Sequence, residues 1–171
     1  MAVTVRAMTL QETAQIIDYF HGSTPEHLET LGVDPSRLPP VSQWQRLYEQ
    51  MFDQPAEQRR SLLVSWLFDG KFFGFSTADK INIGQHAHMH LHITDPSLRQ
   101  QGSGVECVRQ TVELYFQTLK LKQLFCEPHA FNAAPNRTLQ KAGFKYVKTH
   151  MTVPGPLNFH QAVNRWVIDR S

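Results

Sequence analysis

The alternation of apolar and polar positions predicts structure most clearly in the middle of the chain. Between Ala87 and His92, three apolar residues alternate with three histidines, a pattern typical of a half-buried β-strand. From Val105 to Tyr115, apolar residues recur instead at the spacing of one helix face. The turn between these segments contains Gly102 and Gly104. We therefore expect a strand, a glycine-rich turn and a helix, in that order.

Local signals mark where other elements begin and end. Thr9 and Glu12 have the spacing of a capping box, which predicts a helix start. Gly22 and Gly32 are expected to end the first two helices. The expected elements, in chain order, are a strand (3–7), helices (9–22, 25–31 and 42–52), strands (61–68, 72–78 and one ending at 93), a helix ending near 120, a strand (123–127), a helix (132–142) and two strands (144–153 and 163–168).

This order of elements predicts the fold class. We expect an α+β protein with a mixed, mostly antiparallel central sheet and helices on both faces. A chain of 171 residues is long enough for one domain with a substantial core. We expect a single domain over 1–171. In it, 1–60 supply the first strand and a helical lip for the substrate, and 61–171 supply the sheet and the binding core.

Composition and charge exclude several classes of function. The formal net charge is +2 and no run of Lys or Arg occurs, so we expect no nucleic-acid partner. No apolar run approaches membrane-spanning length, so we expect no membrane partner. Cys107 lies in a predicted helix and Cys126 in a predicted strand. Two buried thiols suit a reducing compartment, so we expect a cytoplasmic protein.

The glycine-rich turn is a candidate anion site. Glycines let the backbone approach a ligand closely, and the first N–H groups of a helix have no partner within the helix. Such N–H groups bind phosphates well. Gly102 and Gly104 directly precede the predicted helix. The turn therefore suggests a cofactor that carries a pyrophosphate.

Two motifs resemble the GNAT superfamily of N-acetyltransferases. Residues 99–104 read R-Q-Q-G-S-G, similar to the superfamily's Arg/Gln-x-x-Gly-x-Gly/Ala motif. Residues 132–144 read N-A-A-P-N-R-T-L-Q-K-A-G-F, similar to a segment of the ribosomal-protein alanine acetyltransferases. Residues 87–104 also resemble the A-H-x-H…R-Q-Q-G-x-G segment of arylalkylamine N-acetyltransferases.

The resemblance implies acetyl-CoA as co-substrate and acetyl donor. The acceptor is then a primary amine of a small molecule or of a protein N-terminus. The resemblance implies no metal. Members of the superfamily often dimerise through sheet edges, so a homodimer is possible. The residues expected to contact acetyl-CoA are Leu91, Ile93, Arg99, Gln100, Gln101, Gly102, Ser103, Gly104, Val105, Asn132 and Arg137.

The amine must lose a proton before it attacks. An alkylammonium has a pKa of about 10.4, and an imidazole with a pKa of about 6.5 is suited to accept the proton. We expect His90 to be this base, because it is central in the histidine row and matches the arylalkylamine segment. His88 is the second candidate and Glu127, at the end of the next strand, the third.

The sequence departs from the superfamily pattern at two positions that matter for proton transfer. Leu139 stands where some members have a Tyr that acts as general acid, and Pro135 stands where the second motif has Ser. The predicted strand before the glycine turn also contains no Glu. These departures keep two alternatives open. One is a non-catalytic acetyl-CoA sensor or regulatory protein. The other is an interaction module that binds zinc through the histidine row, which can also be simply a solvated strand surface.

Overall fold

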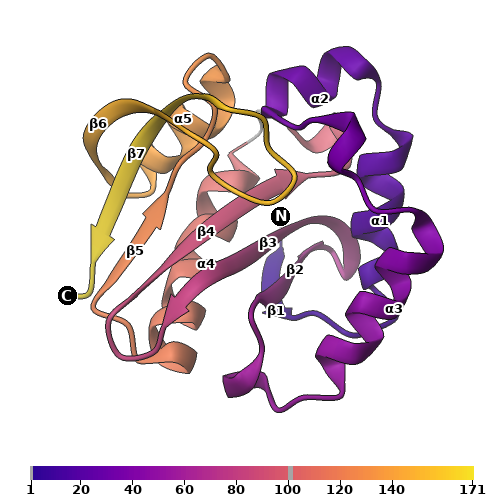
Figure 1. Cartoon of the computed structure of the whole chain (residues 1–171). Coiled ribbons are helices and arrows are strands. Elements are labelled where there is room, and N and C mark those ends of the chain that lie inside the picture. Colours follow the sequence, from indigo (N-terminus) through magenta and orange to yellow (C-terminus); the bar gives the residue numbers. More distant parts are fainter. Residues whose placement is uncertain (1, 100–101) are drawn as a thin grey trace.

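One seven-stranded sheet forms the centre of the computed structural model, which describes residues 2–99 and 102–171 (Figure 1). Its strand order is β1-β2-β3-β4-β5-β7-β6. The strands are β1 (Val3–Ala7), β2 (Leu62–Phe68), β3 (Lys71–Asn82), β4 (His86–Ile93), β5 (Gln123–Cys126), β6 (Lys145–Thr152) and β7 (Gln161–Asp169). Only β4 and β5 run parallel among these described strands. The predicted mixed, mostly antiparallel sheet is confirmed.

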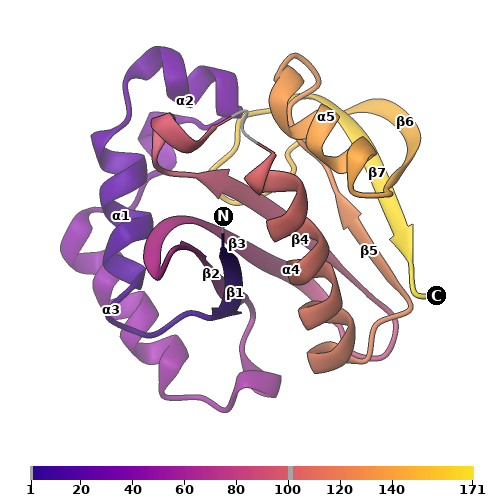
Figure 2. The same cartoon turned by 180° about the vertical axis from the view of Figure 1, so that it is seen from behind.

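Helices cover both faces of the sheet, as expected (Figure 2). Helices α1 (Thr13–Gly22), α2 (Pro25–Leu31) and α3 (Val41–Phe52) pack over one face, and α4 (Ser103–Leu119) and α5 (Ala133–Lys141) over the other. Short 3₁₀ turns that the periodicity did not indicate occupy Pro35–Arg37, Ala56–Gln58 and Pro96–Leu98. Within the described residues, no helix combines the length and the apolar character needed to cross a bilayer.

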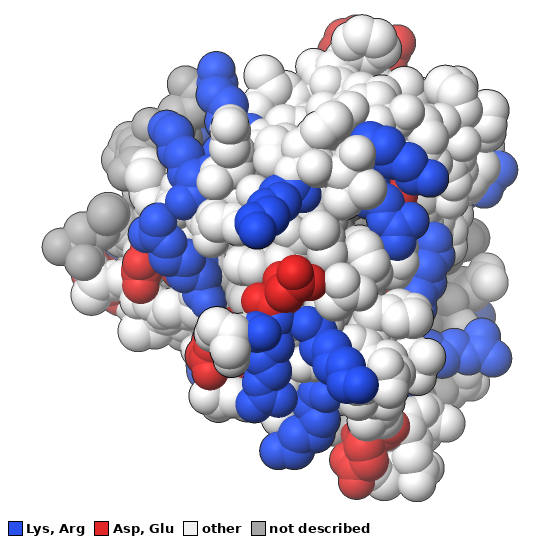
Figure 3. Space-filling model, turned by 90° about the vertical axis from the view of Figure 1, so that its left-hand side faces the viewer, with Lys and Arg blue, Asp and Glu red and all other residues white. Residues whose placement is uncertain are grey.

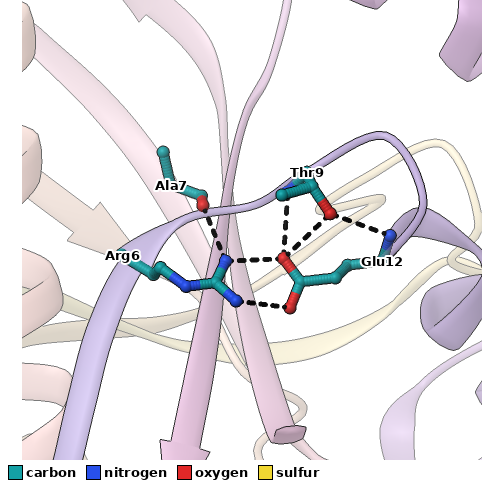
Figure 4. Close-up of polar contacts among 4 residues, drawn as sticks. All are labelled: Arg6, Ala7, Thr9 and Glu12. Carbon is teal, nitrogen blue, oxygen red and sulfur yellow. Dashed lines mark hydrogen bonds and ion pairs between the residues drawn. The ribbon is translucent and has the colours of Figure 1, made fainter. Parts of the chain in front are cut away.

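The predicted capping box forms, but the regular helix starts one turn later. The Thr9 N–H donates to Glu12 Oε1 at 3.0 Å, and the Glu12 N–H donates to Thr9 Oγ1 at 3.2 Å (Figure 4). Arg6 also binds both carboxylate oxygens of Glu12. A preliminary turn therefore occupies residues 10–12, and α1 begins at Thr13.

Strand β3 is longer than its apolar pattern predicts. The alternation predicts an end at Ala78, whereas β3 continues to Asn82. The extension is stabilised by pairing with β4, in which Asp79 lies directly opposite His88. Cross-strand pairing, which a single strand's sequence does not reveal, thus brings a carboxylate to the histidine row.

Strands β4 and β5 separate before β4 ends. Their parallel register runs from His86–Gln123 to Met89–Cys126, and β4 then continues to Ile93 with no described strand paired to it on that side. Figures 1 and 2 show the two arrows diverging toward their tips. The last residues of β4 therefore offer backbone groups to the interior of the molecule.

The edge of the sheet formed by β6 carries positive charge. Strand β6 is an edge strand, and Lys145 and Lys148 on it are exposed. Figure 3 shows Lys and Arg side chains gathered over the side where β6 and β7 lie. Lysines on an edge strand oppose unwanted pairing with another sheet. The homodimer joined at a sheet edge stays a prediction.

Met89 tests how much the core around the divergence contributes to stability. It has no exposed surface and packs in the cluster beneath α4. We expect Met89→Ala to lower the free energy of unfolding by about 2–5 kcal/mol, because a buried cavity replaces the side chain. Urea denaturation measures the loss. Met151→Ala on β6 is the control, since Met151 is 59% exposed, and it should change stability by less than about 0.5 kcal/mol. Equal losses would contradict this account.

Candidate active site

A cavity of about 580 Å³ lies against the glycine-rich turn, and we call it the glycine-turn cavity. Gly102 is the N-cap of α4, with a left-handed φ of 80°, and it supplies no side-chain cap. A Cβ atom built at Gly102 would meet open space. The first N–H groups of α4 therefore face a hollow with room for a ligand, as an anion site requires.

The free end of β4 supplies a second set of backbone groups to this cavity. The Thr94 N–H donates to the Phe73 carbonyl of β3 at 2.8 Å. Because backbone direction alternates along a strand, Leu91 and Ile93 turn their N–H and C=O groups away from β3, to the side that β5 has left. The Ile93 carbonyl accepts hydrogen bonds from Nε and Nη2 of Arg99, at 3.1 and 2.9 Å. The Leu91 N–H and C=O groups point to this same side of β4.

The predicted cofactor residues are brought together, with different side-chain orientations. Asn132 is the N-cap of α5 but makes no side-chain capping bond, and it lines the cavity. Arg137 and Val105 also line it. The Ser103 hydroxyl instead donates to the Leu98 carbonyl at 3.3 Å, so only the backbone of Ser103 can meet a phosphate. The expected contributions of Gln100 and Gln101 lie outside the described residues.

A second cavity, of about 400 Å³, lies over the histidine row and is named the histidine cavity here. Its walls come from β3, β4, α1, α3 and a loop of residues 153–160 between β6 and β7, which we call the strap. Leu91, His92 and Asn132 line both cavities. The two cavities therefore meet at the free end of β4.

His90 lies in the histidine cavity beside a carboxylate. Its Nε2 is 3.2 Å from each carboxylate oxygen of Asp79. The His90 carbonyl accepts the Ser76 hydroxyl at 2.6 Å, and Ser76 in turn accepts the Tyr115 hydroxyl at 3.0 Å. Burial tends to raise the pKa of Asp79, but the bond to His90 and nearby positive charge outweigh it and lower that pKa. Asp79 is thus an ionised partner that orients the His90 ring.

Glu127 holds two histidines from different strands. Its Oε2 is 2.6 Å from His150 Nε2, and its Oε1 is 3.5 Å from His88 Nδ1. The hydrogen bond from His88, opposed by burial and assisted by His150, lowers the pKa of Glu127 to about 2. A carboxylate with so low a pKa is a weak base. Glu127 therefore suits the orientation of His88 and His150 better than proton abstraction.

His92, the last histidine of the row, is enclosed by aromatic rings. The rings of Tyr19, Phe20 and Phe75 lie within 5.5 Å of it, centroid to centroid. Burial, with smaller contributions from nearby positive groups, lowers the pKa of His92 to about 3. His92 is therefore neutral at physiological pH and too weak a base to compete with His90.

The sequence analysis missed Asp79 and His150. Asp79 lies in the part of β3 beyond its predicted end, and His150 lies in β6, which was predicted. Both reach the histidine row only because strands pair in the folded sheet. The three histidines at 88, 90 and 92 are not a solvated surface, since the first two side chains are 14% and 26% exposed and the third is enclosed. No group of three or more His, Cys, Asp or Glu among the described residues could hold a metal ion, so the zinc alternative lacks a ligand set there.

Both cysteines are buried free thiols, as predicted. Cys126 lines the histidine cavity. Burial, together with the charge of Glu127, raises the pKa of the Cys126 thiol above its usual range. A thiol that stays protonated is a poor nucleophile.

A comparison with protein families identifies the family of the chain. A family model described as an acetyltransferase (GNAT) domain matches residues 3–145. The match spans most of the chain, so the protein belongs to the GNAT acetyltransferase family. This confirms the predicted superfamily and the class of enzyme, an N-acetyltransferase that uses acetyl-CoA. No curated protein sequence matches the chain.

Several solved structures share the fold. The aminoglycoside acetyltransferase AAC(6')-Ib with coenzyme A has a TM-score of 0.75 and 19% sequence identity, covering 99% of this chain and 95% of that chain. Spermidine N-acetyltransferase from Vibrio cholerae, with CoA and spermine, has a TM-score of 0.77 and 15% sequence identity, and the match covers 98% of this chain and 95% of that chain. Ribosomal-protein-S5-alanine acetyltransferase from Vibrio fischeri has a TM-score of 0.76 and 14% sequence identity, and the match covers 99% of this chain and 93% of that chain. At these identities the similarity establishes the fold.

The buried His92 predicts an acid-sensitive fold. Its pKa is about 3 when folded and about 6.5 when unfolded. Between these values the unfolded chain binds the extra proton, so stability falls as the pH falls from 6.5 toward 3. At pH 5 the expected penalty is about 2 kcal/mol. We expect His92→Phe to reduce the loss between pH 7.5 and pH 5, measured by urea denaturation.

The exposed His160 provides the control for this measurement. His160→Asn should retain the acid sensitivity of the wild type, because it leaves the buried ring of His92 unchanged. If the wild type and His92→Phe lost stability in parallel, His92 would not be the group responsible.

Proposed function

We propose that the chain transfers an acetyl group from acetyl-CoA directly to a primary amine of a small molecule or peptide, with His90 as the general base. The observation that carries the proposal is the meeting of two cavities at the unpaired end of β4. One cavity has the backbone donors for a phosphate-bearing donor substrate. The other has a histidine–carboxylate pair for an amine.

The glycine-turn cavity fits acetyl-CoA. The N–H groups at the start of α4, beside Gly102 and Gly104, would bind the pyrophosphate. The Asn132 side chain, which makes no capping bond to α5, would hydrogen-bond the pantetheine arm. Arg137, which also lines the cavity, would pair with a phosphate. Arg99 would act mainly by fixing the end of β4, since its guanidinium already donates to Ile93.

The Leu91 N–H would stabilise the reacting thioester. Negative charge builds on the thioester oxygen as the amine nitrogen attacks the carbonyl carbon. A fixed backbone donor at that oxygen contributes about 3 kcal/mol of transition-state stabilisation in comparable sites. The new N–C bond forms, the C–S bond breaks, and the electron pair leaves with sulfur as the CoA thiolate. That thiolate needs little protonation help, so the apolar Leu139 at the usual Tyr position is compatible with turnover.

His90 would take the proton from the attacking amine. With its Nε2–H donated to Asp79, its Nδ1 carries the lone pair that accepts the proton. Asp79 then stabilises the imidazolium that results, as carboxylates do in other histidine–carboxylate pairs. His88 remains the second candidate, oriented by Glu127.

The cysteines support direct transfer. An acyl-enzyme would need a thiolate, and burial raises the pKa of Cys126. Two free cysteines also agree with a reducing compartment, and we propose the cytoplasm as the place of action.

Acetyl-CoA binding tests the cofactor site. We expect Gly102→Glu to weaken binding at least about 100-fold, because it places a carboxylate where the pyrophosphate would lie. Calorimetry measures the affinity. Gly70→Glu is a matched control, because Gly70 has a φ of 81° and open space at its Cβ, as Gly102 does, but lies in the β2–β3 turn. Both variants should lose about 1–2 kcal/mol of stability from backbone strain. Equal affinities for all three proteins would refute the site.

Turnover on a panel of amines tests the base. We expect His90→Gln to lower kcat by about 10²–10⁴-fold while acetyl-CoA affinity stays unchanged. Asp79→Asn should give a smaller loss of kcat, because His90 stays but its orientation and charge support weaken. His160→Gln is the control, because His160 is exposed and is not among the described strap residues that line the cavity. Acetyl-CoA binding without turnover on any amine would favour the non-catalytic sensor instead.

A further inference from the structure

The histidine cavity has two chemically different ends. At one end, Asp79, His90 and Glu127 present polar side chains. At the other end, the wall is built from aromatic and aliphatic side chains of α1 and α3. The acceptor amine must reach His90, so its nitrogen belongs at the polar end. The rest of the acceptor must then lie against the apolar end.

The apolar wall is a stack of rings. Phe20 and Trp44 are 5.9 Å apart with 24° between their planes, and Trp44 and Tyr48 are 6.2 Å apart with 25°. Leu47 and Met51 extend this wall along α3, and Leu47 is 49% exposed. A ligand that covers this surface gains about 25 cal/mol for each Å² of apolar area removed from water.

The charges around the cavity allow one cation. Among the described lining residues, the only carboxylates are Asp79 and Glu127, both at the polar end. The one other permanently charged lining residue described is Arg37, on the side of α2 and α3. A second ammonium group on the acceptor would meet apolar rings and the Arg37 guanidinium, which is already paired with Asp34 at 3.7 Å. Placing an unpaired charge there is costly.

The strap limits the size of the acceptor. Residues from Pro154 to Asn158 line the cavity. The strap is bound to the end of α2, because the Asp34 N–H donates to the Leu157 carbonyl at 2.8 Å and Asn158 Nδ2 donates to the Gly32 carbonyl at 2.9 Å. A folded protein surface cannot approach His90 from this side without breaking these bonds.

We infer that the acceptor is a small primary amine with a single positive charge and an otherwise apolar body. The inference rests on the proposed function and specifies its substrate class. The amine nitrogen lies at Nδ1 of His90, on the side of the ring away from Asp79, and the apolar body packs on the rings of α1 and α3. Polyamines, other polycationic amines and folded protein N-termini are poor acceptors for this cavity.

Matched amines test the substrate class. The release of CoA thiol is measured with hexylamine, with 1,6-diaminohexane, which adds only a second charge, with ethylamine, which lacks most of the apolar body, with spermidine, and with a short peptide that has a free N-terminal alanine. We expect kcat/KM for hexylamine to exceed that of each other amine at least about tenfold. A diamine, polyamine or peptide acetylated as well as hexylamine would overturn the substrate class and leave the transferase function standing. Acetyl-CoA binding with no thiol release from any amine would overturn the proposed function itself.

A charge placed on the apolar wall should change the preference. Leu47→Glu puts a carboxylate at the apolar end, and we expect it to shift the ratio of kcat/KM for 1,6-diaminohexane over hexylamine upward at least about tenfold. Val41→Glu is the control, because Val41 lies on the same helix, is 44% exposed and is outside the cavity lining. An unchanged ratio in Leu47→Glu, or the same shift in Val41→Glu, would contradict the proposed position of the apolar body.

Discussion

The loss of pairing between β4 and β5 is the constraint on which the site depends. Two parallel strands that begin side by side and then diverge leave half-buried backbone groups without strand partners. Such groups must find other partners, because an unsatisfied buried amide is costly. Arg99 satisfies the Ile93 carbonyl, and in the proposed function acetyl-CoA satisfies the Leu91 N–H. Leu91 and His92, in the part of β4 beyond the divergence, line both cavities. One feature of the sheet thus makes both the binding groups and the place where two substrates meet.

Three histidines on one strand face have three different roles because their neighbours differ. His88 and His150 share Glu127. His90 pairs with Asp79, and His92 is enclosed by rings that keep it neutral. The same side chain at a spacing of two residues is therefore a neighbour of the Glu127 carboxylate, a candidate base and a packed core group. Strand periodicity brings the side chains to one face, and the elements that cover that face decide their chemistry.

The sequence predicts the fold well because its strongest signals are local. The capping box of Thr9 and Glu12, the glycine ends of the helices and the alternation in β4 each need only nearby residues. The glycine-rich turn and Asn132 could be predicted as parts of the candidate cofactor site for the same reason. The contribution of Asp79 could not, because the apolar pattern of its strand ends at Ala78 and only pairing with β4 carries it further. The orientation of Arg99 toward Ile93 likewise depends on three-dimensional proximity.

The strap has a consequence for how the protein folds. The Gly32 carbonyl accepts Asn158 and Gln161 side chains from positions 126 and 129 residues away in the chain. Contacts between such distant segments form slowly, because the intervening chain must be ordered first. Closure of the strap therefore belongs late in folding. The same few contacts define a small unit that can open locally while the sheet stays intact. Amide hydrogens of the strap should then exchange with solvent before those of β4, and the cavity over His90 should be lost before the fold itself.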